Sequence, residues 1–331
     1  MRFFRQQLPS GDLQATDDDV RHAYRLLLGR EPDPVGFSSY RHLIRARSVP
    51  ADELAQLFIA SDEFRSKRHD HDMVKVSLPD YALFVSPGDR DISTAIASQQ
   101  AYEPYVEAVL RDLLRPGDTF LDVGANIGYF TALGAHLVGP EGRVIAFEPL
   151  DKNVQLIYAT LWENRFENVT VYPFAASSNA RLVAMSSHVS SSNAGIVNRS
   201  IGEARTRIIA QSQRLDDLLA ATKHIDVVKF DIEGHEMYAW RGAEALLAKH
   251  RPHVLTEFHP KCIRDNTDID PAEYLRKLLE YSATVEVLHR VRPRVACRDV
   301  ESILREWQSA DDEFRMNGAM HIDLYAAGPG R

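Results

Sequence analysis

The chain has 331 residues, of which 44% are hydrophobic, enough to bury the core of one large domain and a small one. Its net charge of −8, from 47 acidic and 39 basic side chains, argues against a nucleic-acid partner, which usually requires a basic face. The two cysteines form neither a disulfide framework nor a metal spacing, and no apolar run suits a signal peptide or an integral membrane segment, so we expect a cytoplasmic protein.

Residues 15–70 predict a small all-α N-terminal domain. An acidic run from Asp17 offers N-cap chemistry for a first helix, whose apolar residues recur at helical spacing as far as Leu28. Two more helical stretches follow, and the charged run at 65–72 indicates a linker.

Residues 74–331 predict a larger α/β domain. A hairpin that begins near Val74 is expected to dock on the sheet. Strands and helices then alternate from Phe120 to Glu257, which argues for a mostly parallel sheet with helices on both faces. The expected sheet strands are 120–123, 144–147, 169–173, 227–230, 253–257, 284–288 and 321–325.

The most informative stretch is 119–148, with the sequence TFLDVGANIGYFTALGAHLVGPEGRVIAFE. It predicts two strands that each end in an acid, Asp122 and Glu148, with a glycine turn and a helix between them. In a parallel sheet both strand ends lie at the edge where ligands bind. Gly124 and Gly128 would let the backbone approach a ligand closely. Glu148 is then placed to accept hydrogen bonds from the two vicinal hydroxyls of a ribose.

The ligand of this turn is expected to be a cation. A dinucleotide usually requires G-x-G-x-x-G, but Asn126 stands where the second glycine would be. Asp122 would repel a phosphate and would suit an ammonium group. S-adenosylmethionine has an ammonium, a sulfonium and a ribose but no phosphate, so we interpret the turn as its binding site. An NAD site and an unliganded βαβ unit are the alternatives.

Acids also end two later strands, at Asp231 and Glu257. Methyl transfer to a hydroxyl needs good alignment and a proton acceptor, for which Asp231, His235 and His259 are the candidates. Glu233 and Glu257 are expected to bind the acceptor or a divalent cation that holds two sugar hydroxyls. Alternatively, the acids only cap the following helices and the histidines are satisfied polar residues.

The blocks DVGANIGYFT, FEP, RLDDLL, KFDIEGHE and EFHP, in this order, resemble those of the FkbM-type methyltransferases over roughly Ala101–Leu288. The resemblance implies a class I methyltransferase (Rossmann-like) fold, S-adenosyl-L-methionine as the cofactor, and O-methylation of a hydroxyl on a small-molecule, sugar, glycan or natural-product acceptor. It places Asp231, Glu233 and His259 near the acceptor. It places against the cofactor Asp122, Gly124, Ala125, Asn126, Gly128 and Glu148, with Ala175 near the adenine.

The run LLLGREPDPVGFSSY in the first domain resembles the bacterial domain of unknown function 4214. That domain often accompanies enzymes acting on glycans, so the resemblance implies a carbohydrate acceptor, and a homodimer or a glycan-enzyme partner bound through this domain. Segments 186–193 and 291–318 are expected to help select the acceptor.

Two other functions remain open. A nucleic-acid methyltransferase would share the fold, but the negative charge and the lack of an N-P-P-[YF] block argue against it. A non-catalytic scaffold for glycan-modifying partners would not need the intact glycine turn or the acids Asp122 and Glu148, so their presence argues against it.

Overall fold

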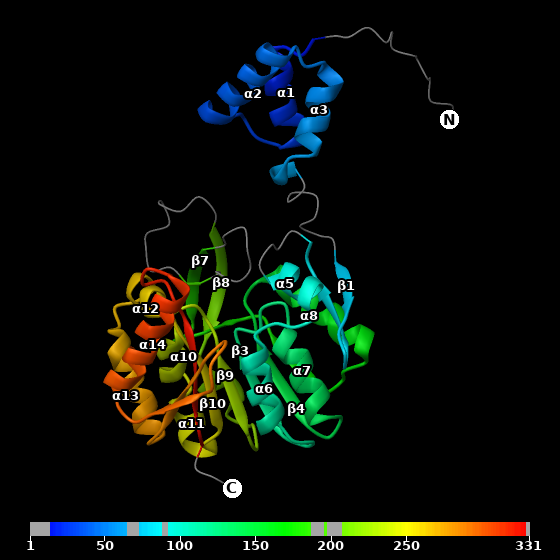
Figure 1. The fold of residues 1–331 in the computed structure, drawn as a ribbon. Coiled ribbons are helices and arrows are strands. Elements are labelled where there is room, and N and C mark those ends of the chain that lie inside the picture. The colour runs from blue at the N-terminus through cyan, green and yellow to red at the C-terminus, as the bar shows by residue number, and fades with distance from the viewer. Residues whose placement is uncertain (1–13, 65–72, 88–91, 187–194, 197–206, 329–331) are drawn as a thin grey trace. The chain divides into compact units, whose positions relative to one another are not determined.

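The computed structural model describes residues 14–64, 73–87, 92–186, 195–196 and 207–328 (Figure 1). The chain divides into two compact units, Met1–Asp72 and Met73–Arg331. The predicted linker at 65–72 and most of the predicted acceptor segment, residues 187–193, lie outside the described residues.

The helices described in full in the first unit are α1 (Asp17–Leu27), α2 (Pro34–Arg47) and α3 (Ala51–Ile59). Thr16 is the N-cap of α1 and accepts from the backbone N–H of Asp19, while Asp19 of the acidic run accepts in return from the N–H of Thr16. Tyr24 meets Phe58 edge to face with ring centres 5.0 Å apart, and Tyr40 stacks on Phe58 at 4.3 Å. These aromatic contacts join the three helices into one small core.

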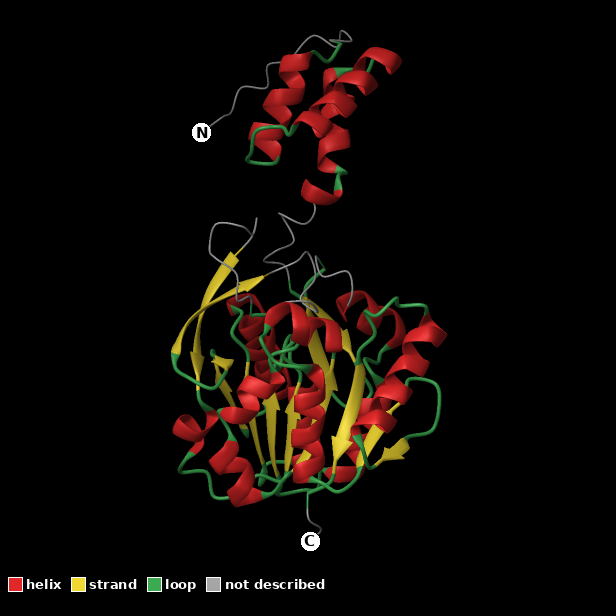
Figure 2. Cartoon of the chain, turned by 90° about the vertical axis from the view of Figure 1, so that its left-hand side faces the viewer, coloured by secondary structure: helices red, strands yellow, loops and turns green. Residues whose placement is uncertain are grey.

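The second unit is built on an eight-stranded sheet in the order β12-β11-β13-β10-β9-β3-β4-β5. From β10 to β5 the strands are parallel, whereas β13 runs antiparallel to both of its neighbours. Helices lie on both sides of the sheet (Figure 2), which confirms the predicted class I methyltransferase fold. The strands are β3 (Thr119–Val123), β4 (Arg143–Phe147), β5 (Val169–Tyr172), β9 (Val227–Phe230), β10 (His253–Phe258), β11 (Val285–Leu288), β12 (Val295–Cys297) and β13 (Ile322–Ala326).

Side chains of these strands alternate between two cores. Phe120 and Val227 belong to the core that includes α6 (Pro104–Leu113) and α7 (Tyr129–Val138). Leu121 and Val228 belong to the core on the other face. That face is covered by α10 (Glu236–Arg241), α11 (Glu244–His250), α13 (Pro271–Tyr281) and α14 (Val300–Phe314). The same alternation puts Asp122 on the α7 face of the sheet.

The N-terminal hairpin of this unit, β1 (Val74–Ser77) and β2 (Ala82–Val85), is a separate two-stranded sheet. It shares a core with the main sheet, through Leu83 and Val85, and its backbone is held by side chains of α8 (Asp151–Asn164). The N–H of Ala82 donates to Asn164 Oδ1 at 2.8 Å, and that of Phe84 donates to Thr160 Oγ1 at 2.9 Å.

A three-stranded sheet stands beside the carboxyl ends of the main strands, in the order β6-β8-β7. Its strands are β6 (Ala175–Ala176), β7 (Arg181–Ser186) and β8 (Arg207–Gln213). Ala175, Val183 and Met185 form a small apolar core with Leu150 and Ile196. The remaining helices are α5 (Ile92–Gln99), α9 (Leu215–Leu219) and α12 (Pro260–Asn266).

Gly124→Ala tests how tightly the loop after β3 is packed. Gly124 has φ +90°, and a Cβ there would lie 1.9 Å from the carbonyl oxygen of Asp231. Gly117 has φ +91° but no atom within 4 Å of such a Cβ. We expect Gly117→Ala to lower the free energy of unfolding by about 1–2 kcal/mol. Gly124→Ala should cost roughly 2 kcal/mol more. Equal losses in urea unfolding would contradict this packing.

Candidate functional site

A cavity of about 310 Å³ opens where the parallel strands end. Its walls come from the loop after β3, the end of β4, the three-stranded sheet, the loop after β9, the end of β10 and the segment before α6. Of the predicted site residues, it is lined by Gly124, Ala125, Asn126, Glu148, Ala175, Asp231, Glu233, Glu257 and His259. Asp122, Gly128 and His235 are not among its lining residues.

Glu148 holds one end of the cavity together. Its Oε2 accepts from the N–H of Asn126 at 2.8 Å. Its Oε1 accepts from the N–H of Leu150 at 2.9 Å and from Asn153 Nδ2 at 3.2 Å. Burial raises the pKa of Glu148 to about 7 even though these hydrogen bonds oppose the shift. The carboxylate is therefore fixed in orientation by the loop after β3 and by the start of α8.

The two glycines of the loop pack against other segments of the chain, and Gly124 also lines the cavity. The Cβ of any larger residue at Gly124 would meet the carbonyl oxygen of Asp231 at 1.9 Å. At Gly128 it would meet Ile157 Cγ1 of α8 at 2.8 Å. The space left by the missing side chains is thus occupied by the protein itself, so these glycines allow segments of the chain to pack closely.

Asp122 was predicted to face an ammonium group, but the structure buries it behind the cavity. Its carboxylate accepts from Thr131 Oγ1 of α7 at 2.6 Å, and Lys229 is its register partner on β9. Burial raises the pKa of Asp122 above its ordinary value. Asp122 is only 1% exposed, and the hydrogen bond from Thr131 holds its carboxylate against α7 instead of in the cavity.

The wall beside Glu148 is apolar. Leu150, Ala175, Met185 and Ile196 line the cavity and form one small core. Such a slot suits a flat ring like adenine, with Glu148 in reach of the attached ribose. The residues at this end therefore fit an adenosyl group.

Lys229 is a lining residue that the sequence analysis missed. Its side chain is only 3% exposed, and its Nζ lies 2.5 Å from Asp231 Oδ2 and 4.8 Å from the ring centre of Phe130. Lysines are rarely buried this deeply without an acidic partner. The sequence signal that could have identified Lys229 is a lysine inside the apolar run VVKF, directly before Asp231.

A tight loop after β9 presents the next carboxyl group. Glu233 has φ +57° and Gly234 has φ +90°. Glu236, fully buried, accepts from the N–H groups of Ile232 and Gly234 at 3.0 and 3.1 Å and so fixes this turn. Burial and the nearby Asp231 raise the pKa of Glu233 to about 9.

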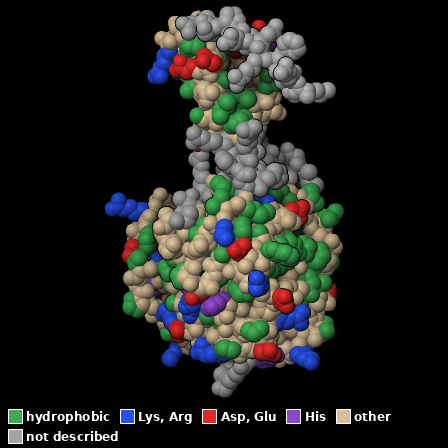
Figure 3. Space-filling view, turned by 90° about the vertical axis from the view of Figure 1, so that its right-hand side faces the viewer, with side chains coloured by type: hydrophobic (Ala, Val, Ile, Leu, Met, Phe, Trp, Pro, Cys, Tyr) green, Lys and Arg blue, Asp and Glu red, His purple; other side chains and the backbone are tan. Residues whose placement is uncertain are grey.

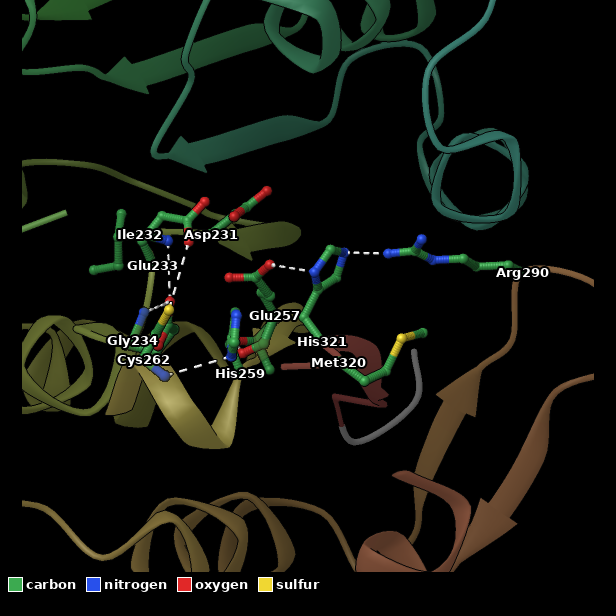
Figure 4. Close-up of polar contacts among 12 residues, drawn as sticks. Asp231, Ile232, Glu233, Gly234, Glu257, His259, Cys262, Arg290, Met320 and His321 are labelled. Atoms are coloured by element: carbon green, nitrogen blue, oxygen red, sulfur yellow. Dashed lines mark hydrogen bonds and ion pairs between the residues drawn. The ribbon is translucent and has the colours of Figure 1, made fainter. Parts of the chain in front are cut away.

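The two predicted histidine bases are poorly placed to take a proton. His259 Nδ1 accepts from the N–H of Cys262 at 3.4 Å (Figure 4), so the neutral ring carries its proton on Nε2 and is a donor there. His235 is buried outside the cavity and stacks on Tyr238, and burial lowers its pKa to about 4. Among the three predicted bases, Asp231 therefore has the position of an acceptor.

His321, from the segment before β13, is a second lining residue that was not predicted. Its Nδ1 lies 3.7 Å from Glu257 Oε1, and Arg290 donates to its Nε2 at 2.5 Å (Figure 4). Burial and Arg290 lower the pKa of His321 to about 4, so the neutral ring donates from Nδ1 toward Glu257.

A binding site for a divalent cation has no support in the described part of the chain, where no group of three or more His, Cys, Asp or Glu side chains is arranged to hold a metal ion.

Among the same residues, no helix is long and apolar enough to cross a membrane.

Comparison with known families adds to this geometry. The family described as Methyltransferase FkbM domain matches residues 122–283. The chain carries an FkbM-type methyltransferase domain. This match confirms the predicted enzyme class and, with it, S-adenosyl-L-methionine as the methyl donor. The family Protein-L-isoaspartate(D-aspartate) O-methyltransferase also matches, over residues 69–173, a range that includes β3, β4 and β5.

Curated relatives match short stretches of the chain. A protein-L-isoaspartate O-methyltransferase from Triticum aestivum is 37% identical over 84 residues, 23% of this chain and 36% of that protein. One from Methanopyrus kandleri is 39% identical over 80 residues, 24% of this chain and 33% of that protein. The chain thus spans about a third of the length of these relatives.

Solved structures are similar at low identity. Methyltransferase FkbM from Methylobacillus flagellatus has 14% identity and a TM-score of 0.40, over 92% of this chain and 58% of that one. Fibrillarin from Aeropyrum pernix, solved with natively bound S-adenosyl-L-methionine, has 13% identity and a TM-score of 0.38, over 68% of this chain and 74% of that one.

The raised pKa of Glu233 predicts how stability depends on pH. Between about pH 7 and about pH 8.5 the folded state holds a proton on Glu233 that the unfolded state, with its ordinary pKa of 4.5, has lost. The free energy of unfolding should therefore fall as the pH rises, by up to about 1.4 kcal/mol per pH unit for each such group. Urea unfolding across this range measures the slope.

Glu233→Gln should flatten that slope, because the amide does not titrate. Glu280→Gln, on the exposed side of α13, is the matched control and should keep the slope of the wild-type protein. A slope unchanged in Glu233→Gln would contradict the buried, protonated state of Glu233.

Proposed function

We propose that the protein transfers a methyl group from S-adenosyl-L-methionine to a hydroxyl of a sugar, glycan or natural product. The observation that carries this proposal is a single cavity with two different ends. One end has the clamped carboxylate of Glu148 beside an apolar slot, and the other has Asp231 held by the buried Lys229. A donor and an acceptor would meet between them.

The donor end suits S-adenosylmethionine better than a dinucleotide. Lys229 is the one lysine or arginine among the described residues that line the cavity, against the acids Glu103, Glu148, Asp231, Glu233 and Glu257. A pyrophosphate would add negative charge beside these carboxyl groups, whereas a ligand with a net positive charge would let them ionise. Glu148 would bind the ribose hydroxyls, and Ala125 and Asn126 would face the rest of the donor.

Asp231 is the proposed proton acceptor. When bound, the donor supplies a methyl group on a positively charged sulfur. Lys229 engages Oδ2 of Asp231 and orients the carboxylate, so that Oδ1 can accept the proton of an acceptor hydroxyl. Glu233 and Glu257 would bind neighbouring hydroxyls, and His259 would donate a hydrogen bond from Nε2.

A neutral polyol fits the acceptor end better than an acid does. Burial and neighbouring carboxylates raise the pKa of Glu257 and of Glu103 well above the ordinary value. Protonated carboxyl groups both donate and accept hydrogen bonds, as a hydroxyl-rich acceptor requires. A carboxylate substrate, such as the isoaspartyl group named for the curated relatives, would add a further negative charge here.

The first unit is proposed to carry the link to glycans. Its sequence resembles the bacterial domain of unknown function 4214, which supports a carbohydrate acceptor and a homodimer or partner enzyme bound through this unit. A nucleic-acid acceptor is less well supported. The net charge is −8, and one face of the second unit intersperses basic with acidic side chains (Figure 3). The intact cavity argues against a scaffold without activity.

Asp231→Asn tests the proposed base. We expect methyl transfer to fall at least about 100-fold, because general-base catalysis is lost. The affinity for S-adenosylhomocysteine should stay within about threefold, because the donor end is unchanged. Calorimetry measures the affinity. Mass spectrometry of cell-envelope glycans, from cells producing each variant or lacking the protein, detects transfer as the added mass of one CH₂ group.

Asp112→Asn is the matched control, since this aspartate lies on α6 in an exposed ion pair with Arg294. It should methylate as the wild-type protein does. Full methylation by Asp231→Asn, or a loss explained by weaker donor binding alone, would refute the proposed role of Asp231.

A further inference from the structure

Three carboxyl groups lie side by side at the strand ends on one face of the main sheet. Asp231 directly follows β9, Glu257 lies on β10 and Asp323 lies on β13, in neighbouring strands. Glu257 and Asp323 are direct partners across the antiparallel pair. Their Cβ atoms are therefore expected about 5 Å apart, a spacing at which like charges repel. We call these three residues the acid row.

The acid row is poorly compensated. Glu257 is 7% exposed, it lines the cavity, and its Oε2 has no hydrogen-bond partner among the described residues. Lys229 contacts Asp231, and the other nearby cation, Arg290, contacts His321 rather than the row itself. Glu103 and Glu233 add two more carboxyl groups around the same end of the cavity.

The acid row, together with Glu103 and Glu233, has more carboxyl groups than nearby positive charges among the described residues. Each carboxyl group raises the pKa of its neighbours, as Asp231 and Asp323 do for Glu257. A positive charge placed in the cavity would relieve this repulsion and let the carboxylates ionise. Buried carboxyl groups without full hydrogen bonding are costly in an empty site, so they are expected where a ligand supplies the missing interaction.

We propose that the acid row makes the cavity select the positively charged donor over its neutral product. This inference rests on the proposed function, because it assumes that the donor sulfur faces Asp231 and Glu257. S-adenosylmethionine carries a positive sulfur. S-adenosylhomocysteine lacks it, because the electrons of the broken carbon–sulfur bond stay on sulfur when the methyl group leaves. The acid row would therefore bind S-adenosylmethionine more tightly than S-adenosylhomocysteine.

Calorimetric titration of the whole protein with three ligands tests this selection. S-adenosylmethionine and sinefungin both carry a positive charge at the transfer position, and S-adenosylhomocysteine does not. We expect the wild-type protein to bind both charged ligands more tightly than the neutral one. Glu257→Gln and Glu233→Gln should each weaken binding of the charged ligands by roughly threefold to tenfold and leave S-adenosylhomocysteine unchanged, because each removes a carboxyl group that can ionise beside the bound positive charge.

Glu280→Gln, which removes an exposed acid from α13, is the matched control and should change none of the three affinities. The glutamine variants keep the shape of the buried side chains and remove repulsion, so their thermal unfolding midpoints should not fall. If S-adenosylhomocysteine binds as tightly as the charged ligands, or if the variants change all three affinities equally, the acid row does not select by charge. If none of the three ligands binds, the proposed function itself fails.

Discussion

The carboxylate of Glu148 is the contact on which the cavity depends. It accepts hydrogen bonds from the backbone of Asn126 and Leu150 and from the side chain of Asn153. These bonds join the loop after β3, the end of β4 and the first turn of α8. The same loop is also bound to the carbonyl of Phe147 by two backbone hydrogen bonds. Without this clamp, neither the apolar slot nor the approach of the loop to Asp231 would be fixed.

The two ends of the cavity meet opposite physical demands. At the donor end the one acid, Glu148, is satisfied by protein hydrogen bonds, so it is preorganised for neutral hydroxyls. At the acceptor end there are more carboxyl groups than positive charges among the residues that the structure describes. Lys229 contacts Asp231 and none of the other described carboxyl groups that line the cavity. Because only Asp231 of these groups is paired with a cation, its proposed role differs from that of the neighbouring carboxyl groups. One carboxylate is oriented by a cation, while its neighbours hold protons and can donate hydrogen bonds.

Much of the fold could be predicted because strands buried on both faces give continuous apolar runs, as in Val227–Val228 of β9. The acids at the ends of these runs, Glu148, Asp231 and Glu257, all line the cavity. Asp122 was misplaced because its carboxylate is buried and bound by Thr131 of α7, a contact that the strand pattern does not contain.

Other parts of the site depend on long-range contacts that no local pattern contains. His321 reaches the cavity only because β13 inserts antiparallel beside β10. The tautomer of His259 is set by the amide of Cys262 at the start of α12, a helix that the sequence analysis did not predict. The helix α14 was also missed, although Ile303 and Ala310 are buried on one side of it.

A crystal structure with S-adenosylhomocysteine tests the central claim most directly, namely that a glycine loop and a clamped carboxylate hold an adenosyl donor rather than a phosphate. We expect the ribose hydroxyls on Glu148, the adenine against Ala175 and Met185, and the sulfur facing Asp231. A cavity that stays empty at saturating ligand, or that instead takes a dinucleotide with its pyrophosphate on the loop after β3, would contradict this claim.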